Sequence, residues 1–121
     1  MATLDLFRNA ENARSFNEGD IVFSAGDVGE EMFVVLDGSC EILIGDRIAA
    51  TLGPGEIVGE MALIDDQHVR SAHVRAGTPL TLAPIDRRQF EFMLRNHPHF
   101  AVDVMKTMVE RLHKMNALHA S

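Results

Sequence analysis

The 121-residue sequence contains one cysteine, Cys40, and no long apolar run. One thiol cannot form an intramolecular disulfide, so a disulfide-stabilised fold is excluded and a reducing compartment is expected. No apolar run approaches the ~18 consecutive residues of a membrane-spanning helix. The first ten residues, MATLDLFRNA, lack the pattern of a secretory signal. We therefore expect a cytoplasmic chain without a membrane segment.

Positive charge is scarce in the first half of the chain. Residues 1–66 contain 14 Asp and Glu but only three Arg, a balance of −11. Residues 67–121 contain eight Lys and Arg and four acidic side chains, a balance of +4. Direct nucleic-acid binding by general attraction to phosphate is therefore not expected. Any site for an anion has to be built locally, from a few basic side chains and backbone N–H groups.

Short apolar segments separated by glycines fill the chain from Ala13 onwards. This spacing is typical of an antiparallel barrel or sandwich, and the length is that of one domain. The dipeptide Asp37-Gly38 predicts a hairpin between two of the strands. Strands are predicted at residues 21–23, 32–36, 40–44, 48–52, 57–58, 70–76 and 80–85.

Two helices are predicted after the last strand, in addition to a short one at residues 1–12. The first begins at Asp86, because Asp86 and Gln89 have the spacing of a capping box, and it ends near Arg95. The segment Asn96-His97-Pro98 breaks the pattern, and the second helix runs to about residue 118. It carries a stripe with a 4-3-4-3 spacing: Ala101, Met105, Met108, Leu112 and Met115. This stripe indicates either packing against the barrel, or a dimer seam or mobile lid over a ligand.

The most specific pattern is the stretch GPGEIVGEMALIDDQHVRSAHVRA, residues 53–76. Glu60 to Ile64 reads as about one turn of helix that begins after Gly59. The start of a helix has unpaired N–H groups and a partial positive charge, which attract an anion that glycine allows to come close. In the strand predicted at residues 70–76, Arg70 falls on the same face as the apolar residues Ala72, Val74 and Ala76. An inward guanidinium needs an anionic partner, because burying it alone costs several kcal/mol.

The segments Gly59-Glu60-Met61-Ala62-Leu63 and Arg70-Ser71-Ala72 together resemble the phosphate-binding cassette of the cyclic nucleotide-binding domain family. That family includes protein kinase A regulatory subunits, the catabolite activator protein and cyclic-nucleotide-gated channels. The resemblance covers nearly the whole chain and implies an α+β fold in a single domain, residues 1–121. It implies an antiparallel, jelly-roll-like β-barrel over about residues 13–86, with an inserted cassette helix and C-terminal helices over about residues 86–118.

The resemblance also implies roles for individual residues. The N–H groups of Met61, Ala62 and Leu63 and the guanidinium of Arg70 would bind the cyclic phosphate. Ser71 would add a hydroxyl donor, and the small side chain of Ala72 would leave room for its own N–H.

The remaining predicted site residues would bind the nucleoside. Glu60 would accept a hydrogen bond from the ribose 2′-OH. An apolar wall is expected from Val58, Leu63 and Val74. Candidates for contacts to the base are Arg111 and Lys114.

The expected function is that of a regulatory sensor with cAMP or cGMP as its ligand. No cofactor, metal or catalytic residue is expected. A sequence-specific regulator of this family would continue into a helix-turn-helix, and a channel would be preceded by membrane helices. Neither pattern is present, so a stand-alone sensor or an excised piece is expected. An effector protein or a second copy would bind the last helix.

Two alternatives remain open. One is a nucleotide-insensitive interaction module that keeps the same fold. The other is a cupin-like metalloenzyme, because small barrels with several histidines hold metals. The histidines do not form a cluster of ligands at useful spacing, which counts against a metal. They are His68, His73, His97, His99, His113 and His119.

Overall fold

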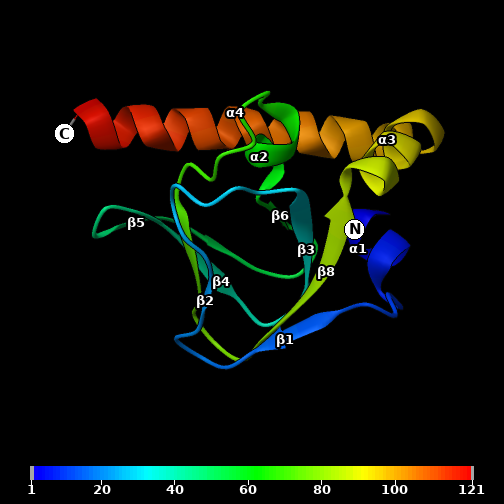
Figure 1. Ribbon diagram of the computed structural model, residues 1–121, viewed down its shortest axis with the longest axis horizontal. Coiled ribbons are helices and arrows are strands. Elements are labelled where there is room, and N and C mark those ends of the chain that lie inside the picture. Colours follow the sequence, from blue (N-terminus) through cyan, green and yellow to red (C-terminus); the bar gives the residue numbers. More distant parts are fainter. Residues whose placement is uncertain (1, 121) are drawn as a thin grey trace.

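The computed structural model describes residues 2–120 as two antiparallel sheets with helices against one of them (Figure 1). One sheet contains, in spatial order, β1 (Arg14–Phe16), β8 (Leu80–Asp86), β3 (Glu31–Asp37) and β6 (Ile57–Val58). The other contains β2 (Ile21–Phe23), β7 (His73–Ala76), β4 (Cys40–Ile44) and β5 (Arg47–Leu52). The helices are α1 (Ala2–Phe7), α2 (Glu60–Ile64), α3 (Arg87–Asn96) and α4 (Pro98–Ala120).

The predicted α+β architecture, with antiparallel strands followed by C-terminal helices, is confirmed. The strands form two separate sheets, however, and do not close into a barrel. Helix α4 runs across one end of the sheets, and α2 lies beside it (Figure 1). Of the helices described between residues 2 and 120, none has the length and apolar character that spanning a membrane requires.

Strand β3 is buried on both of its faces. Phe33 and Val35 pack into the core between the two sheets. Met32 and Val34 point the other way and pack with side chains of α3 and α4, including Phe100. A strand with two buried faces is apolar at every position, which explains why this segment reads as a continuous apolar run.

The hairpin predicted at Asp37-Gly38 is wrong, because β3 and β4 belong to different sheets. The chain crosses between the sheets here, beside the turn that leads from β7 back to β8. The N–H of Ser39 donates to Thr78 Oγ1 at 2.9 Å across these two turns. A Cβ on Gly38 would lie 2.0 Å from the carbonyl oxygen of Pro79, so glycine is required by this close approach as well as by its φ of 81°.

The predicted helix boundaries are largely confirmed. Asp86 accepts from the N–H of Gln89 and Gln89 Oε1 accepts from the N–H of Asp86, which completes the capping box. His97 caps the end of α3, and Pro98 begins α4. Helix α1 is shorter than predicted and ends at Phe7, because the asparagines that follow are weak helix formers. Residue 1 lies outside the described residues.

The predicted stripe on α4 is divided: Met108 packs on the buried face of the helix, whereas two other members are exposed. Met105 and Leu112 are 56% and 53% exposed, so the prediction that they pack against the barrel is wrong. The buried face of α4 begins with Phe100 and Val104, which pack against β3, β8 and α3. The side chain of Met115 is outside the described residues. A dimer seam and a mobile lid both stay predictions for this helix.

Cys40 is fully buried between the sheets. Burial raises the pKa of its thiol to about 12, although the charge of Arg111 acts in the opposite direction. Because the thiolate is the reactive form, we expect the folded protein to react with iodoacetamide at pH 8 at least about 100-fold more slowly than the urea-unfolded chain. Mass spectrometry of the alkylated chain measures both rates. Equal rates would contradict this prediction.

Candidate functional site

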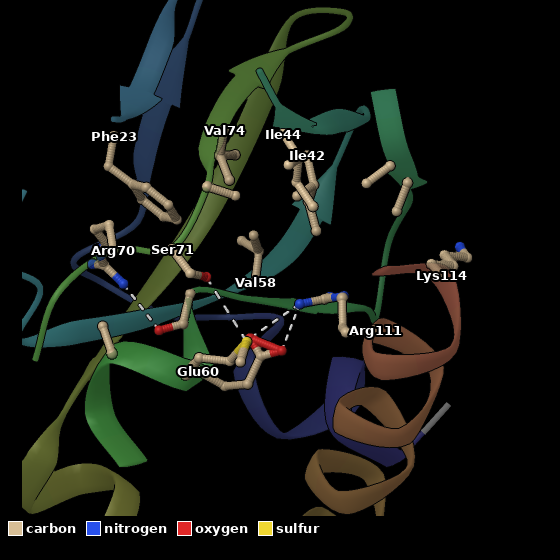
Figure 2. A pocket seen from close by; sticks show the side chains of 16 residues that line it. Phe23, Ile42, Ile44, Val58, Glu60, Arg70, Ser71, Val74, Arg111 and Lys114 are labelled. Carbon is tan, nitrogen blue, oxygen red and sulfur yellow. Dashed lines mark hydrogen bonds and ion pairs between the residues drawn. The ribbon is translucent and has the colours of Figure 1, made fainter. Parts of the chain in front are cut away.

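An apolar cavity lies between α2, the start of β7, and α4 (Figure 2). Eleven of the twelve predicted site residues line it: Val58, Gly59, Glu60, Met61, Ala62, Arg70, Ser71, Ala72, Val74, Arg111 and Lys114. Leu63 is the exception. It lies on the opposite side of α2 and packs into the core between β3, β8 and the helices, so the apolar-wall role predicted for it is wrong.

Five further residues of the cavity wall were not predicted. They come from strands of the sheet that lies across from α2: Phe23, Ile42, Ile44, Ala49 and Ala50. The alternation of Ile42 and Ile44 along β4 marked them as residues of one face. Nothing in the sequence indicated that this face would form the far wall of the site.

Gly59 shapes the entry to α2. Its φ of 81° is in the left-handed region, which side chains other than glycine rarely adopt. A Cβ at this position would also lie 2.7 Å from Arg70 Nη1. Glycine is therefore needed here both for the turn and for the close approach of the guanidinium.

Arg70 is only 6% exposed, and its guanidinium is held by backbone carbonyls. Nη1 donates to the oxygen of Gly59 at 2.9 Å, and Nη2 donates to the oxygen of Glu31 at 2.7 Å. Its Cζ lies 4.0 Å from the centre of the Phe23 ring, a cation–π contact. The predicted need for a directly bound anion is thus not met within this structure. Burial lowers the pKa of Arg70, and the nearby carboxylates of Glu31 and Asp27 oppose that shift.

The chain between residues 70 and 72 is irregular, so the strand predicted at 70–76 begins only at His73. Arg70 instead pairs with the loop before β3: its N–H donates to the oxygen of Asp27, and its oxygen accepts from the N–H of Gly26. Strict alternation would have turned Ser71 away from Arg70. Because the strand starts later, both side chains line the cavity (Figure 2).

Glu60 is 1% exposed and forms an ion pair with Arg111 of α4, whose side chain is 13% exposed. Arg111 Nη1 reaches both carboxylate oxygens, at 2.5 and 3.0 Å, and Nη2 donates to the carbonyl oxygen of Ile57. Burial raises the pKa of Glu60. The charge of Arg111, the backbone N–H groups of Glu60 and Met61, and the charge of Arg70 act in the opposite direction.

Arg111 and Lys114 were predicted to contact a base; both line the cavity, and the contact to a base stays a prediction. Arg111 points into the cavity and is occupied by Glu60 and Ile57. Lys114 lies at the edge of the cavity, one turn further along α4, and its side chain points away from Glu60 (Figure 2). Sequence reasoning gave no indication of the pairing between residues 60 and 111.

The cavity is small in this conformation. The volume that the centres of water molecules can occupy inside it is about 50 Å³. This is enough for a few waters. Pockets that enclose small ligands typically measure ~300–1,000 Å³. A nucleotide-sized ligand would therefore require α4 to move away, or would extend out of the cavity into solvent.

Among the described residues, no three or more His, Cys, Asp and Glu side chains lie closely enough together to hold a metal ion.

Comparisons with known proteins agree on one family. A family model described as the cyclic nucleotide-binding domain matches residues 13–97. The chain is 37% identical over 92 residues to a cAMP-dependent protein kinase regulatory subunit of Schizosaccharomyces pombe, covering 75% of this chain and 21% of the relative. It is 34% identical over 102 residues to a cyclic nucleotide-gated potassium channel of Mesorhizobium japonicum, covering 84% of this chain and 28% of the channel.

A solved structure gives the same result for the fold. The Thermus thermophilus catabolite activator protein superimposes with a TM-score of 0.76 at 27% identity, covering 98% of this chain and 58% of that protein. The chain therefore spans between about a fifth and three fifths of these three relatives. The fold, the match over residues 13–97 and the two sequence relatives together show that this chain belongs to the cyclic nucleotide-binding domain family.

Proposed function

We propose that this domain binds cAMP or cGMP in the cavity between α2, β7 and α4, and that it acts as a regulatory sensor. The observation that carries the proposal is the presence of both Glu60 and Arg70, each almost fully buried, in the wall of one largely apolar cavity. A cyclic nucleotide offers one negative charge, a ribose hydroxyl and a flat base. Each has a counterpart among these residues.

The phosphate would bind at Arg70 and Ser71. A guanidinium has five N–H donors, and the contacts to Gly59 and Glu31 leave others for phosphate oxygens. The Ser71 hydroxyl donates to the sulfur of Met61 at 3.9 Å, which is a weak acceptor that a phosphate oxygen would replace. The N–H groups of Glu60 and Met61 already donate to the Glu60 carboxylate, so of the first N–H groups of α2 those after Met61 would remain for the phosphate.

The ribose and base would occupy the rest of the cavity. Glu60 would accept a hydrogen bond from the 2′-OH, and a site built for a hydroxyl rejects ligands that lack one. Val58, Val74 and the strand residues opposite α2 would supply the apolar wall. Closing the ligand off from solvent would require α4 to change its position, which favours the mobile lid proposed for this helix.

The remaining parts of the proposal concern the whole protein. The two sequence relatives are a kinase regulatory subunit and a channel, so we propose a regulatory rather than a catalytic role. A cytoplasmic location is proposed from the single buried thiol. A second copy or an effector protein is proposed to bind the exposed side of α4, which includes Val102, Met105, Val109 and Leu112.

Isothermal titration calorimetry tests the ligand. We expect cAMP or cGMP to bind with a dissociation constant in the micromolar range or lower, about −8 kcal/mol, because both recognition groups are present. Thermal melting in the presence of each nucleotide and of Zn²⁺ gives an independent measurement. No heat and no change in melting temperature at millimolar nucleotide would favour the nucleotide-insensitive module instead. A shift with Zn²⁺ alone would favour the metalloenzyme.

A further inference from the structure

Helix α4 directs the charged side chain of Arg111 along its buried face toward the cavity. Phe100, Val104 and Met108 follow one another at four-residue spacing along this face, and Arg111 comes three residues later. The same packing that holds the first two against the sheets therefore directs Arg111 into the cavity. Its guanidinium fixes both oxygens of Glu60 and the carbonyl of Ile57 at once.

The charges around Glu60 come from three elements. Arg111 is bonded to the carboxylate from α4, and Arg70 acts on it from the segment before β7. On α2, the backbone N–H groups of Glu60 and Met61 donate to it. Lys114 lines the same cavity without bonding to Glu60. After burial, which raises the pKa of Glu60, the largest effect on this pKa is the charge of Arg111, which lowers it.

We propose that Arg111 is a positioning residue that keeps Glu60 ionised, so that acceptance of a ligand hydroxyl depends on the position of α4. A buried carboxylate without its cation takes up a proton. A protonated Glu60 would present an O–H donor on one oxygen, and it would accept a hydrogen bond from a ligand hydroxyl more weakly than the carboxylate, which keeps lone pairs beside Arg111. Once a ligand has entered, recognition of its hydroxyl would then require α4 to take up the position described here, with Arg111 on Glu60. The claim that α4 controls recognition of a ligand hydroxyl rests on the proposed function. The claim that Arg111 keeps Glu60 ionised does not.

The first test follows the ionisation of Glu60 directly, by ¹³C NMR titration of its carboxyl group. Arg111→Gln removes the charge and keeps a hydrogen-bond donor. Arg111→Lys keeps the charge but loses the planar guanidinium that donates to two partners at once. We expect the Glu60 signal to titrate at clearly higher pH in Arg111→Gln than in the parent, with Arg111→Lys close to the parent. Lys114→Gln is the matched control and should leave the signal unchanged. Equal titration in parent and Arg111→Gln would overturn the proposal.

A failure of Arg111→Gln to fold is also informative. Because burial raises the folded-state pKa of Glu60 above its unfolded value, stability is lost as pH rises from the unfolded pKa through the folded pKa, and this loss is larger without the charge of Arg111. The proposal therefore expects Arg111→Gln to recover its melting transition at pH 5 if it is unfolded at pH 7. Absence of a folded state at both pH values, with Arg111→Lys unfolded as well, would assign Arg111 a packing role and overturn the proposal.

The second test measures affinity for cAMP and for 2′-deoxy-cAMP between pH 5 and pH 8. We expect the preference for cAMP to be largest at pH 8, and Arg111→Gln to lose about tenfold or more of it at a higher pH than the parent and Arg111→Lys do. Unchanged preference in Arg111→Gln at every pH would overturn the ligand part. Absence of binding in the parent would instead refute the proposed function, while the NMR titration would still decide the role of Arg111.

Discussion

Replacement of Arg70 by alanine is expected to weaken cyclic nucleotide binding by about 2–4 kcal/mol, because a buried charge-assisted contact to the phosphate is lost. Arg75→Ala is the matched control. Arg75 comes from the same segment and forms an ion pair with Glu41, outside the cavity. It should bind like the parent in calorimetry. If Arg70→Ala also binds like the parent, the proposed phosphate site is wrong.

The same substitution has a cost in stability that the structure makes evident. Removal of the guanidinium leaves the carbonyl oxygens of Gly59 and Glu31 without their donors. An unsatisfied buried acceptor costs about 1–3 kcal/mol, so the melting temperature of Arg70→Ala should fall even without ligand. Arg70→Lys separates the two effects. It keeps the charge, but a single ammonium cannot reproduce the fork that bonds both carbonyls, and we expect binding between that of Arg70→Ala and the parent.

Replacement of Gly29 by alanine is expected to reduce binding nearly as much as the loss of Arg70 itself. A Cβ on Gly29 would lie 2.3 Å from Nε and 2.5 Å from Cζ of Arg70. The guanidinium is held between this glycine and the Phe23 ring, so it cannot give way without leaving its two carbonyl partners. A displaced guanidinium loses its contact to the phosphate, so the loss of affinity should approach the ~2–4 kcal/mol expected for Arg70→Ala.

Gly53→Ala provides the control for this variant. Gly53 precedes the same cassette, a Cβ added to it would meet no atom within 4 Å, and it does not need a left-handed φ. Calorimetry with cAMP and cGMP should therefore give parental affinity for Gly53→Ala and a large loss for Gly29→Ala. A crystal structure of Gly29→Ala with Arg70 unmoved, or undiminished binding, would show that the close packing does not fix the guanidinium.

Features that depend on neighbouring residues were predictable from the sequence. The capping box joins Asp86 and Gln89, three residues apart, and the glycine before α2 is read from the motif Gly59-Glu60. Most of the strands were found because their apolar residues alternate or run together. The wrong predictions concern which distant segments of the chain lie next to each other. The turn at Asp37-Gly38 has the expected residues, but which sheet the next strand joins depends on strands far along the chain.

The cassette motif by itself determined the family of this domain and the part of the cavity wall that residues 58–74 form. Tertiary structure alone decided how those residues are held. Gly29 and Phe23 pack on Arg70 from 41 and 47 residues earlier in the chain, and Arg111 reaches Glu60 from 51 residues later. The physical reason is that a local pattern specifies backbone conformation and the side of an element that is buried. The partner of a buried charge depends on which distant elements pack there, and no spacing in the sequence records that.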